Sequence, residues 1–64
     1  MRDTNLMEIR ALFEERGFKP GEGLFYPALS AQLGNPRPDS LAAAIEEAVS
    51  TNAFTWKDDW LKLS

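Results

Sequence analysis

The spacing of apolar residues changes once along this chain, near Asn52, and the change requires both helices and strands. Before Asn52, apolar residues recur at intervals of three and four, which is the period of an amphipathic helix. After it they alternate, as they do along a strand with one buried face. The chain contains no cysteine and no histidine, so neither a disulfide framework nor a zinc site of the usual kind is available. We therefore expect an α+β fold of residues 1–64 as a single domain that is held together by packing alone.

The first predicted helix covers residues 6–16. Asn5 followed three residues later by Glu8 is typical of a helix N-cap with its capping-box partner. Gly17 suits the left-handed position that follows a final helical turn. This Schellman geometry would bring Phe18 back onto the helix.

The middle of the chain predicts a turn, a short extended segment and a short helix. Pro20 and Gly21 suit the central positions of a type II turn. The stretch "GLFY" is too brief for a helix and predicts an extended segment over residues 24–26, a candidate third strand. Pro27 is tolerated in a first helical turn, so "PALSAQLG" predicts a short helix that ends at Gly34. That helix would bury two leucines, Leu29 and Leu33.

A third helix is predicted after "NPRPD", with Asp39 or Ser40 as its N-cap. Its apolar positions follow helical spacing: Leu41, Ala44, Ile45, Ala48 and Val49. Its other face carries small and acidic residues: Ala42, Ala43, Glu46, Glu47 and Ser50. We expect that outward face to contain no basic side chain.

The last residues predict a β-hairpin whose register can be tested against burial. With Asp58 and Asp59 as a two-residue loop, the cross-strand pairs are Lys57 with Trp60, Trp56 with Leu61, Thr55 with Lys62, and Phe54 with Leu63. One face then carries Phe54, Trp56, Leu61 and Leu63, which we assign to the core. The opposite face carries Ala53, Thr55, Lys57, Trp60, Lys62 and Ser64. A three-residue loop would scatter the apolar residues over both faces and is therefore disfavoured.

This order of elements resembles the winged helix-turn-helix superfamily. The residues that carry the resemblance are "PALSAQLG", then "SLAAAIEEAV" as the second helix of the motif, then "AFTWKDDWLKLS" as the two wing strands. The resemblance implies a three-helix core closed by a C-terminal β-hairpin and the segment after the first helix. It most often implies DNA binding through the helix at residues 40–51. Two departures are the proline-rich turn "NPRPD" and the minimal wing loop.

The side chains required for DNA binding are scarce. Base edges are read chiefly by Arg, Lys, Asn and Gln, and phosphates are bound by basic side chains. The motif helix offers Glu46 and Glu47 instead, and the net charge is -3. A DNA-binding alternative would use Arg37, Lys57 and Lys62 in a dimer.

Nothing in the sequence points to catalysis, a cofactor or a metal. The adjacent acidic pairs, such as Asp58 with Asp59, lack the spaced oxygen ligands of a calcium loop. Gly21 and Gly23 in "PGEG" lack the Lys-Ser/Thr that follows in a phosphate loop. We therefore expect no enzyme. No apolar run reaches the roughly 20 residues of a membrane-spanning helix, and no secretory signal is present. A cytoplasmic protein is expected.

The residues of most interest are apolar ones that the pattern places at the surface. Trp60 faces outward beside Lys57 and Lys62 and has two interpretations. In the first, the ring lies under the lysine side chains in cation–π contacts. In the second, Trp60 anchors a partner, since Trp is enriched among interface hot spots. Tyr26, together with either Leu24 or Phe25, and Met7 on the flank of the first helix would form a modest apolar patch. Glu46 and Glu47 would face a basic partner.

The main hypothesis is a non-enzymatic protein-interaction module that binds a protein partner through its wing and its acidic third helix. Its small size suggests an accessory, inhibitory or regulatory factor, such as a phage or mobile element encodes. The predicted partner-binding residues are Tyr26, Glu46, Glu47, Lys57, Trp60 and Lys62. The alternatives are a small dimeric DNA-binding regulator and a subunit of a larger assembly that buries the hairpin edge by strand addition. The sequence leaves open whether the exposed apolar residues form a homodimer or a heterocomplex.

Overall fold

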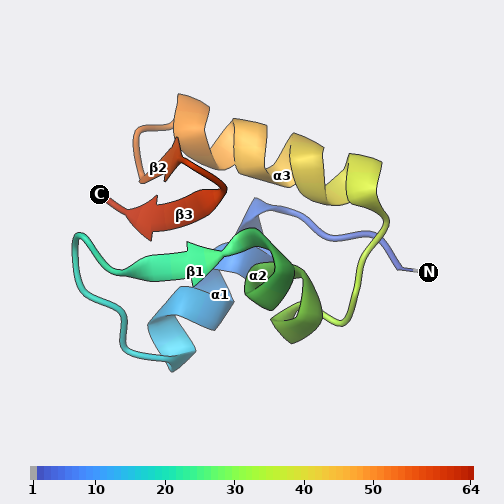
Figure 1. The fold of residues 1–64 in the computed structure, drawn as a ribbon, viewed down its shortest axis with the longest axis horizontal. Coiled ribbons are helices and arrows are strands. Elements are labelled where there is room, and N and C mark those ends of the chain that lie inside the picture. Colours follow the sequence, from blue (N-terminus) through green and yellow to red (C-terminus); the bar gives the residue numbers. More distant parts are fainter. Residues whose placement is uncertain (1) are drawn as a thin grey trace.

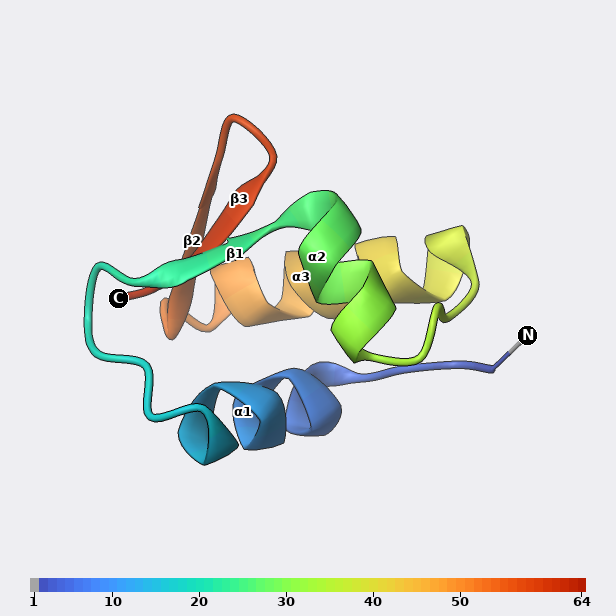
Figure 2. The same ribbon diagram turned by 60° about the horizontal axis from the view of Figure 1, so that its bottom comes forward.

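The computed structural model describes residues 2–64 as three helices and a three-stranded antiparallel sheet, which confirms the α+β class. The elements, in chain order, are α1 (Leu6–Glu15), β1 (Gly23–Phe25), α2 (Tyr26–Gln32), α3 (Pro38–Ser50), β2 (Phe54–Lys57) and β3 (Trp60–Leu63). The three helices surround a common core, and the sheet closes one end of it (Figure 1). The tip of the β2–β3 hairpin extends away from the helices (Figure 2).

The ends of α1 form as the sequence predicts, with one difference. The Glu8 N–H donates to Asn5 Oδ1 at 3.0 Å, so Asn5 is the N-cap. The Glu8 carboxylate does not serve as the capping-box partner and instead accepts hydrogen bonds from Arg2 and Thr4. Gly17 has a φ of 70°, which is left-handed. This conformation completes the Schellman motif that ends α1.

The Schellman motif delivers an aromatic side chain to the core. The Phe18 N–H donates to the Phe13 carbonyl oxygen at 3.0 Å, and the two ring centroids lie 4.8 Å apart. Phe13 in turn makes an edge contact with Phe54 from β2, with 5.0 Å between centroids. The end of α1 and the hairpin are therefore joined through three aromatic rings.

The predicted hairpin register is confirmed. Phe54 pairs with Leu63 and Lys57 with Trp60, and the strand order β1-β3-β2 makes β3 the central strand. The loop residues Asp58 and Asp59 have φ values of 52° and 66°, as a type I′ turn requires. Aspartate tolerates this conformation better than most residues with a side chain, which explains how Asp-Asp replaces the favoured Asn-Gly or Asp-Gly.

Some predicted boundaries were wrong. The short helix predicted over "PALSAQLG" covers Tyr26–Gln32, so it begins one residue before Pro27. The extended segment covers Gly23–Phe25 and not residues 24–26, because Tyr26 already belongs to the first turn of α2. The third helix begins at Pro38, with Arg37 at the N-cap position, and not after Asp39 or Ser40. Proline is well suited to the first helical positions, since the N–H that it lacks would have no partner there.

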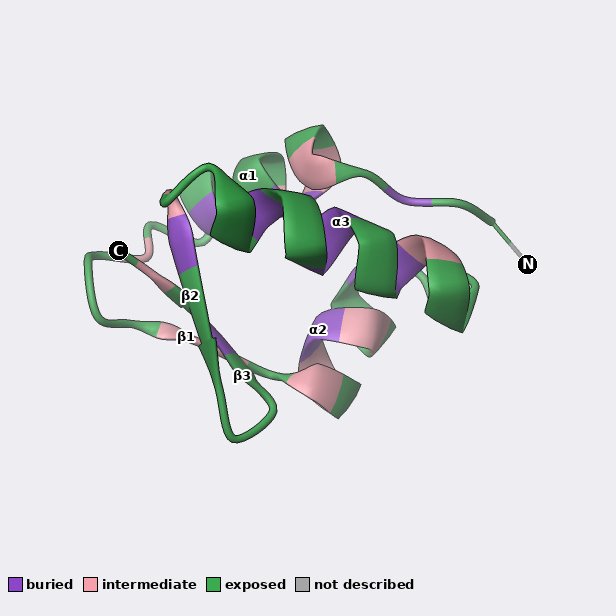
Figure 3. Cartoon of the chain, turned by 90° about the horizontal axis from the view of Figure 1, so that it is seen from above, coloured by how far each residue is buried: buried purple, intermediate pink, exposed green. Residues whose placement is uncertain are grey.

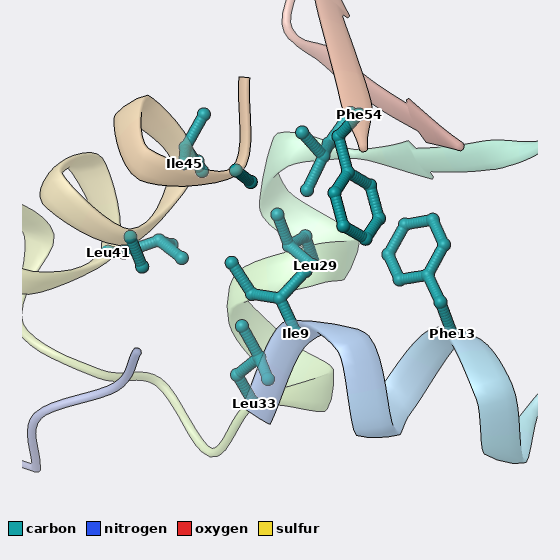
Figure 4. Packing of buried hydrophobic residues seen from close by; sticks show 10 residues of the cluster. Ile9, Phe13, Leu29, Leu33, Leu41, Ile45 and Phe54 are labelled. Atoms are coloured by element: carbon teal, nitrogen blue, oxygen red, sulfur yellow. The ribbon is translucent and has the colours of Figure 1, made fainter. Parts of the chain in front are cut away.

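The core lies between the helices and the inner face of the sheet (Figure 4). Its buried hydrophobic residues are Ile9, Phe13, Leu29, Leu33, Leu41, Ala44, Ile45, Ala48, Phe54 and Leu61. Val49 was predicted to be one of them, but it is 36% exposed. Val49 lies near the end of α3 where the helix faces the groove described below, so its side chain is only partly covered.

The segment before α1 is fastened to the beginning of α3. The Thr4 N–H donates to Ser40 Oγ at 2.9 Å, and the Ser40 hydroxyl donates back to the Thr4 carbonyl oxygen at 3.1 Å. The Arg37 N–H donates to the Arg2 carbonyl oxygen at 2.9 Å. These bonds hold the start of the chain across the α2–α3 turn.

We expect Ser40→Ala to lower the free energy of unfolding by about 1 to 2 kcal/mol, since it removes the acceptor of the partly buried Thr4 N–H. Urea denaturation followed by circular dichroism measures the change. Ser50→Ala is the matched control, because the exposed Ser50 hydroxyl bonds only within its own helix and should change stability by less than about 0.5 kcal/mol. Equal losses in the two variants would contradict the role of Ser40.

Gly23 is the position where β1 tolerates no side chain. A Cβ atom there would lie 2.0 Å from the Leu61 carbonyl oxygen and 2.7 Å from the Lys62 Cα, both of which are backbone atoms of β3. We expect Gly23→Ala to cost about 3 kcal/mol or more, because a strand must shift to relieve the overlap. Gly17→Ala, which meets nothing within 4 Å, should cost only about 1 to 2 kcal/mol for its left-handed backbone. Thermal unfolding of both variants tests this ranking, and a smaller loss in Gly23→Ala would refute it.

Candidate functional site

The outer face of the sheet is one candidate site. We define the outer sheet face as Phe25, Lys57, Trp60 and Lys62, which the strand register places on the side away from the core. Phe25 and Trp60 are direct cross-strand partners on β1 and β3, and their ring centroids lie 5.5 Å apart at 42°. The two rings are 43% and 41% exposed. An aromatic pair therefore lies at the surface, with Lys57 opposite Trp60 on β2 and Lys62 two residues further along β3.

Trp60 faces outward, as predicted, but its aromatic contact comes from β1. Of the two predicted candidates for the outward position, Phe25 occupies it, while Leu24 packs against the core. The contact with Phe25 covers one side of the indole and leaves about two-fifths of Trp60 exposed. Trp60 is therefore supported by Phe25 on one side and keeps an exposed surface on the other.

Trp56 was assigned to the core, and that assignment was wrong. The prediction placed Trp56 on the correct face of the hairpin, because Phe54 and Leu61 on that face are buried. Trp56 itself is 37% exposed, since it lies on an edge strand close to the hairpin tip, which extends beyond the helices (Figure 2). It makes an edge-to-face contact with Tyr26, with 6.1 Å between ring centroids and 89° between planes.

The exposed side of Trp56 faces a groove between α3 and the hairpin, the second candidate site. We name it the α3–β2 groove and define its lining by Tyr26, Ala42, Ile45, Glu46, Val49, Ser50 and Trp56. Its volume is about 550 Å³, similar in size to small-molecule sites, although the groove is open to solvent rather than enclosed. The five α3 residues follow helical spacing, so a single stripe of α3 forms one wall.

The exposed surface of α3 is acidic and apolar. Its outer side is open to solvent along most of its length (Figure 3). Glu46 and Glu47 are exposed there, and α3 itself carries no Lys or Arg. Glu46 lines the α3–β2 groove, whereas Glu47, one residue further around the helix, does not.

The predicted site residues thus separate into groups. Lys57, Trp60 and Lys62 lie together on the outer sheet face. Tyr26 and Glu46 both line the α3–β2 groove. Arg37 is the N-cap residue of α3, and the hairpin follows the other end of that helix. Arg37 pairs with Asp3 at 2.9 Å and with Asp39 at 3.9 Å. It therefore does not form a surface with the two lysines.

At these surfaces, sequence reasoning left one residue undecided and placed two others wrongly. Phe25 was one of two candidates, and the strand register with β3 was needed to choose between them. Trp56 and Val49 were assigned to the core because alternation and helical period report which face a residue occupies, but not how far the neighbouring elements extend over it. The position of Trp56 next to the loop was the available signal.

The structure gives no sign of other kinds of site within the part that it describes. Across residues 2–64, no three acidic side chains come together in a way that would hold a metal ion. None of the helices in that range has the length and apolar character needed to cross a membrane. No protein-family model matches the chain, and no curated protein or solved structure is significantly similar to it.

The two tryptophans should contribute less to stability than the phenylalanine at the base of the hairpin. Phe54 is 2% exposed, so we expect Phe54→Ala to cost about 3 to 5 kcal/mol, enough to unfold a domain of this size. We expect Trp56→Ala and Trp60→Ala to cost roughly 1 to 2 kcal/mol each, because both rings are already partly hydrated. Circular dichroism at increasing urea concentration distinguishes the three variants, and an unfolded Trp56→Ala would place that ring in the core after all.

Proposed function

We propose that this chain is a non-enzymatic protein-binding module with a winged-helix arrangement, in which the hairpin and α3 together contact the partner. The order helix, strand, two helices and hairpin supports that arrangement, as does the position of β3 between β1 and β2. A small regulatory or inhibitory factor is the role that fits such a module, since binding is the activity that its surface offers.

The observation that carries the proposal is the exposure of both tryptophans on opposite faces of one hairpin. Trp60 is 41% exposed on the outer sheet face, and Trp56 is 37% exposed in the α3–β2 groove. A chain of 64 residues has few large side chains with which to build a core, so leaving two at the surface reduces its stability. Trp and Tyr are the residues most enriched where binding energy concentrates. The hairpin is therefore the part of the molecule best suited to hold a partner.

DNA binding is less well supported. The exposed side of α3 would bring Glu46 and Glu47 toward the phosphates. Arg37 already pairs with two aspartates at the far end of α3. Lys57 and Lys62 remain, but they share a sheet face with an aromatic pair and do not extend the surface of α3.

Strand addition is a second way in which a protein could occupy this hairpin. β2 is an edge strand, because the sheet order is β1-β3-β2. With Phe54–Lys57 it presents a short edge to which a partner strand could pair. This mode would use the backbone of β2 and would add to the side-chain contacts proposed above.

The test begins with capture of partners from the native host by the tagged chain, followed by mass spectrometry and purification of the partner. We expect Trp60→Ala to weaken binding of that partner at least about tenfold, as hot-spot truncations do. The double variant Glu46→Lys with Glu47→Lys should weaken it similarly through charge reversal. Met7→Ala is the matched control, since Met7 is a large apolar residue, 78% exposed, on α1. Unchanged affinity in both hairpin and helix variants, each confirmed to be folded, would refute the proposal.

A further inference from the structure

Two aromatic rings meet at a right angle in the α3–β2 groove. Tyr26, from the first turn of α2, and Trp56, from β2, form an edge-to-face pair with an interplanar angle of 89°. Rings in this arrangement leave part of a π face open on the side that they do not share. The faces of aromatic rings carry partial negative charge and attract ammonium and guanidinium groups, most strongly when the ring is Trp.

The charged residue of the same groove is an acid. Glu46 is exposed on α3, and across residues 2–64 it forms no ion pair with a basic side chain. The acids that do form ion pairs, Asp3, Glu8 and Asp39, belong to the N-terminal segment, α1 and the start of α3. Glu46 lines the same groove as the two aromatic rings and has no ion-pair partner among residues 2–64, so the groove has a negative potential and no cation of its own to neutralise it.

The remaining lining is aliphatic apart from Ser50, whose hydroxyl already donates to the Glu47 carbonyl oxygen within α3. Ala42, Ile45 and Val49 form a stripe along one side of α3, and the small side chain of Ala42 leaves room beside the helix. Lysine and arginine bury their alkyl stems against such surfaces while their charged ends remain paired or hydrated. The groove thus offers an apolar surface for the alkyl stem of a lysine or arginine, and aromatic rings and a carboxylate for its charged end.

We infer that the α3–β2 groove binds a lysine or arginine side chain on a polypeptide partner, with the cation between Tyr26, Trp56 and Glu46. The inference rests on the proposed function and gives the chemistry of that partner. An acidic segment would meet the Glu46 carboxylate without a counterion, and a purely apolar segment would bury that charge unpaired. Charge complementarity therefore favours a basic side chain.

The inference is tested on the ¹⁵N-labelled chain with four small probes: the N-acetyl amides of lysine, arginine, norleucine and glutamate. Norleucine has an alkyl chain like that of lysine but no ammonium group, so it isolates the effect of charge. The two indole N–H signals report the two faces of the hairpin separately, and Trp60→Phe assigns them by leaving only the signal of Trp56. Spectra are recorded at increasing probe concentration and at two protein concentrations.

We expect the lysine and arginine amides to shift the Trp56 indole signal in a saturable way, with affinities in the millimolar range, and to leave the Trp60 signal in place. Norleucine and glutamate amides should bind at least about fivefold more weakly. Glu46→Gln should weaken lysine-amide binding by about fivefold, whereas Glu47→Gln, the neighbouring acid outside the groove, should change it less than twofold.

Three results would overturn the inference. The first is equal binding of norleucine and lysine amides, which would show a merely apolar groove. The second is no saturable shift of Trp56 with any probe. The third is a Trp56 shift that depends on protein concentration alone, which would place a second copy of the chain in the groove. None of these results decides the proposed function, which depends on the effect of Trp60→Ala and charge reversal on the captured partner.

Discussion

The pairing of β3 with two strands at once is the contact on which the rest of this structure depends. β3 pairs with β2 through a two-residue turn and also pairs with β1, which lies far from it in the sequence. This pairing holds the two parts of the chain together over the core. Leu61, at the centre of β3, is fully buried between Leu24 and Trp56. The close approach of β1 to β3 requires Gly23, because a side chain at that position would overlap the backbone of β3.

The same pairing creates both candidate binding surfaces. On the outer side it brings Phe25 next to Trp60, two residues far apart in sequence that form one aromatic pair on the same face as the two lysines. On the inner side it leaves Trp56 on an edge strand, beyond the cover of the helices, where Tyr26 supports it from α2. Two faces of opposite character result: the outer face combines aromatic rings with positive charge, and the α3–β2 groove combines them with negative charge.

This separation of charge is more informative than the net charge of the chain. A net charge of -3 describes a weakly acidic molecule, yet Lys57 and Lys62 lie on one side of the hairpin while Glu46 and Glu47 lie on α3. Electrostatic complementarity sets the orientation and the association rate of protein complexes more than their affinity. A partner that contacts both the hairpin and α3 would therefore be oriented by charge and retained by the aromatic side chains.

The sequence by itself determined the local features of this protein. Asn5 and Gly17 set the ends of α1, and the alternation of apolar residues after Asn52 set the hairpin register and the outward direction of Trp60. These features depend on backbone preferences and on periodicity, both of which are determined by residues close together in the sequence. Only the tertiary structure decided that Phe25 rather than Leu24 lies beside Trp60, and that Trp56 and Val49 line a groove instead of the core. The physical reason is that burial depends on how far other elements extend over a residue, and that reach is fixed by contacts between segments distant in the sequence.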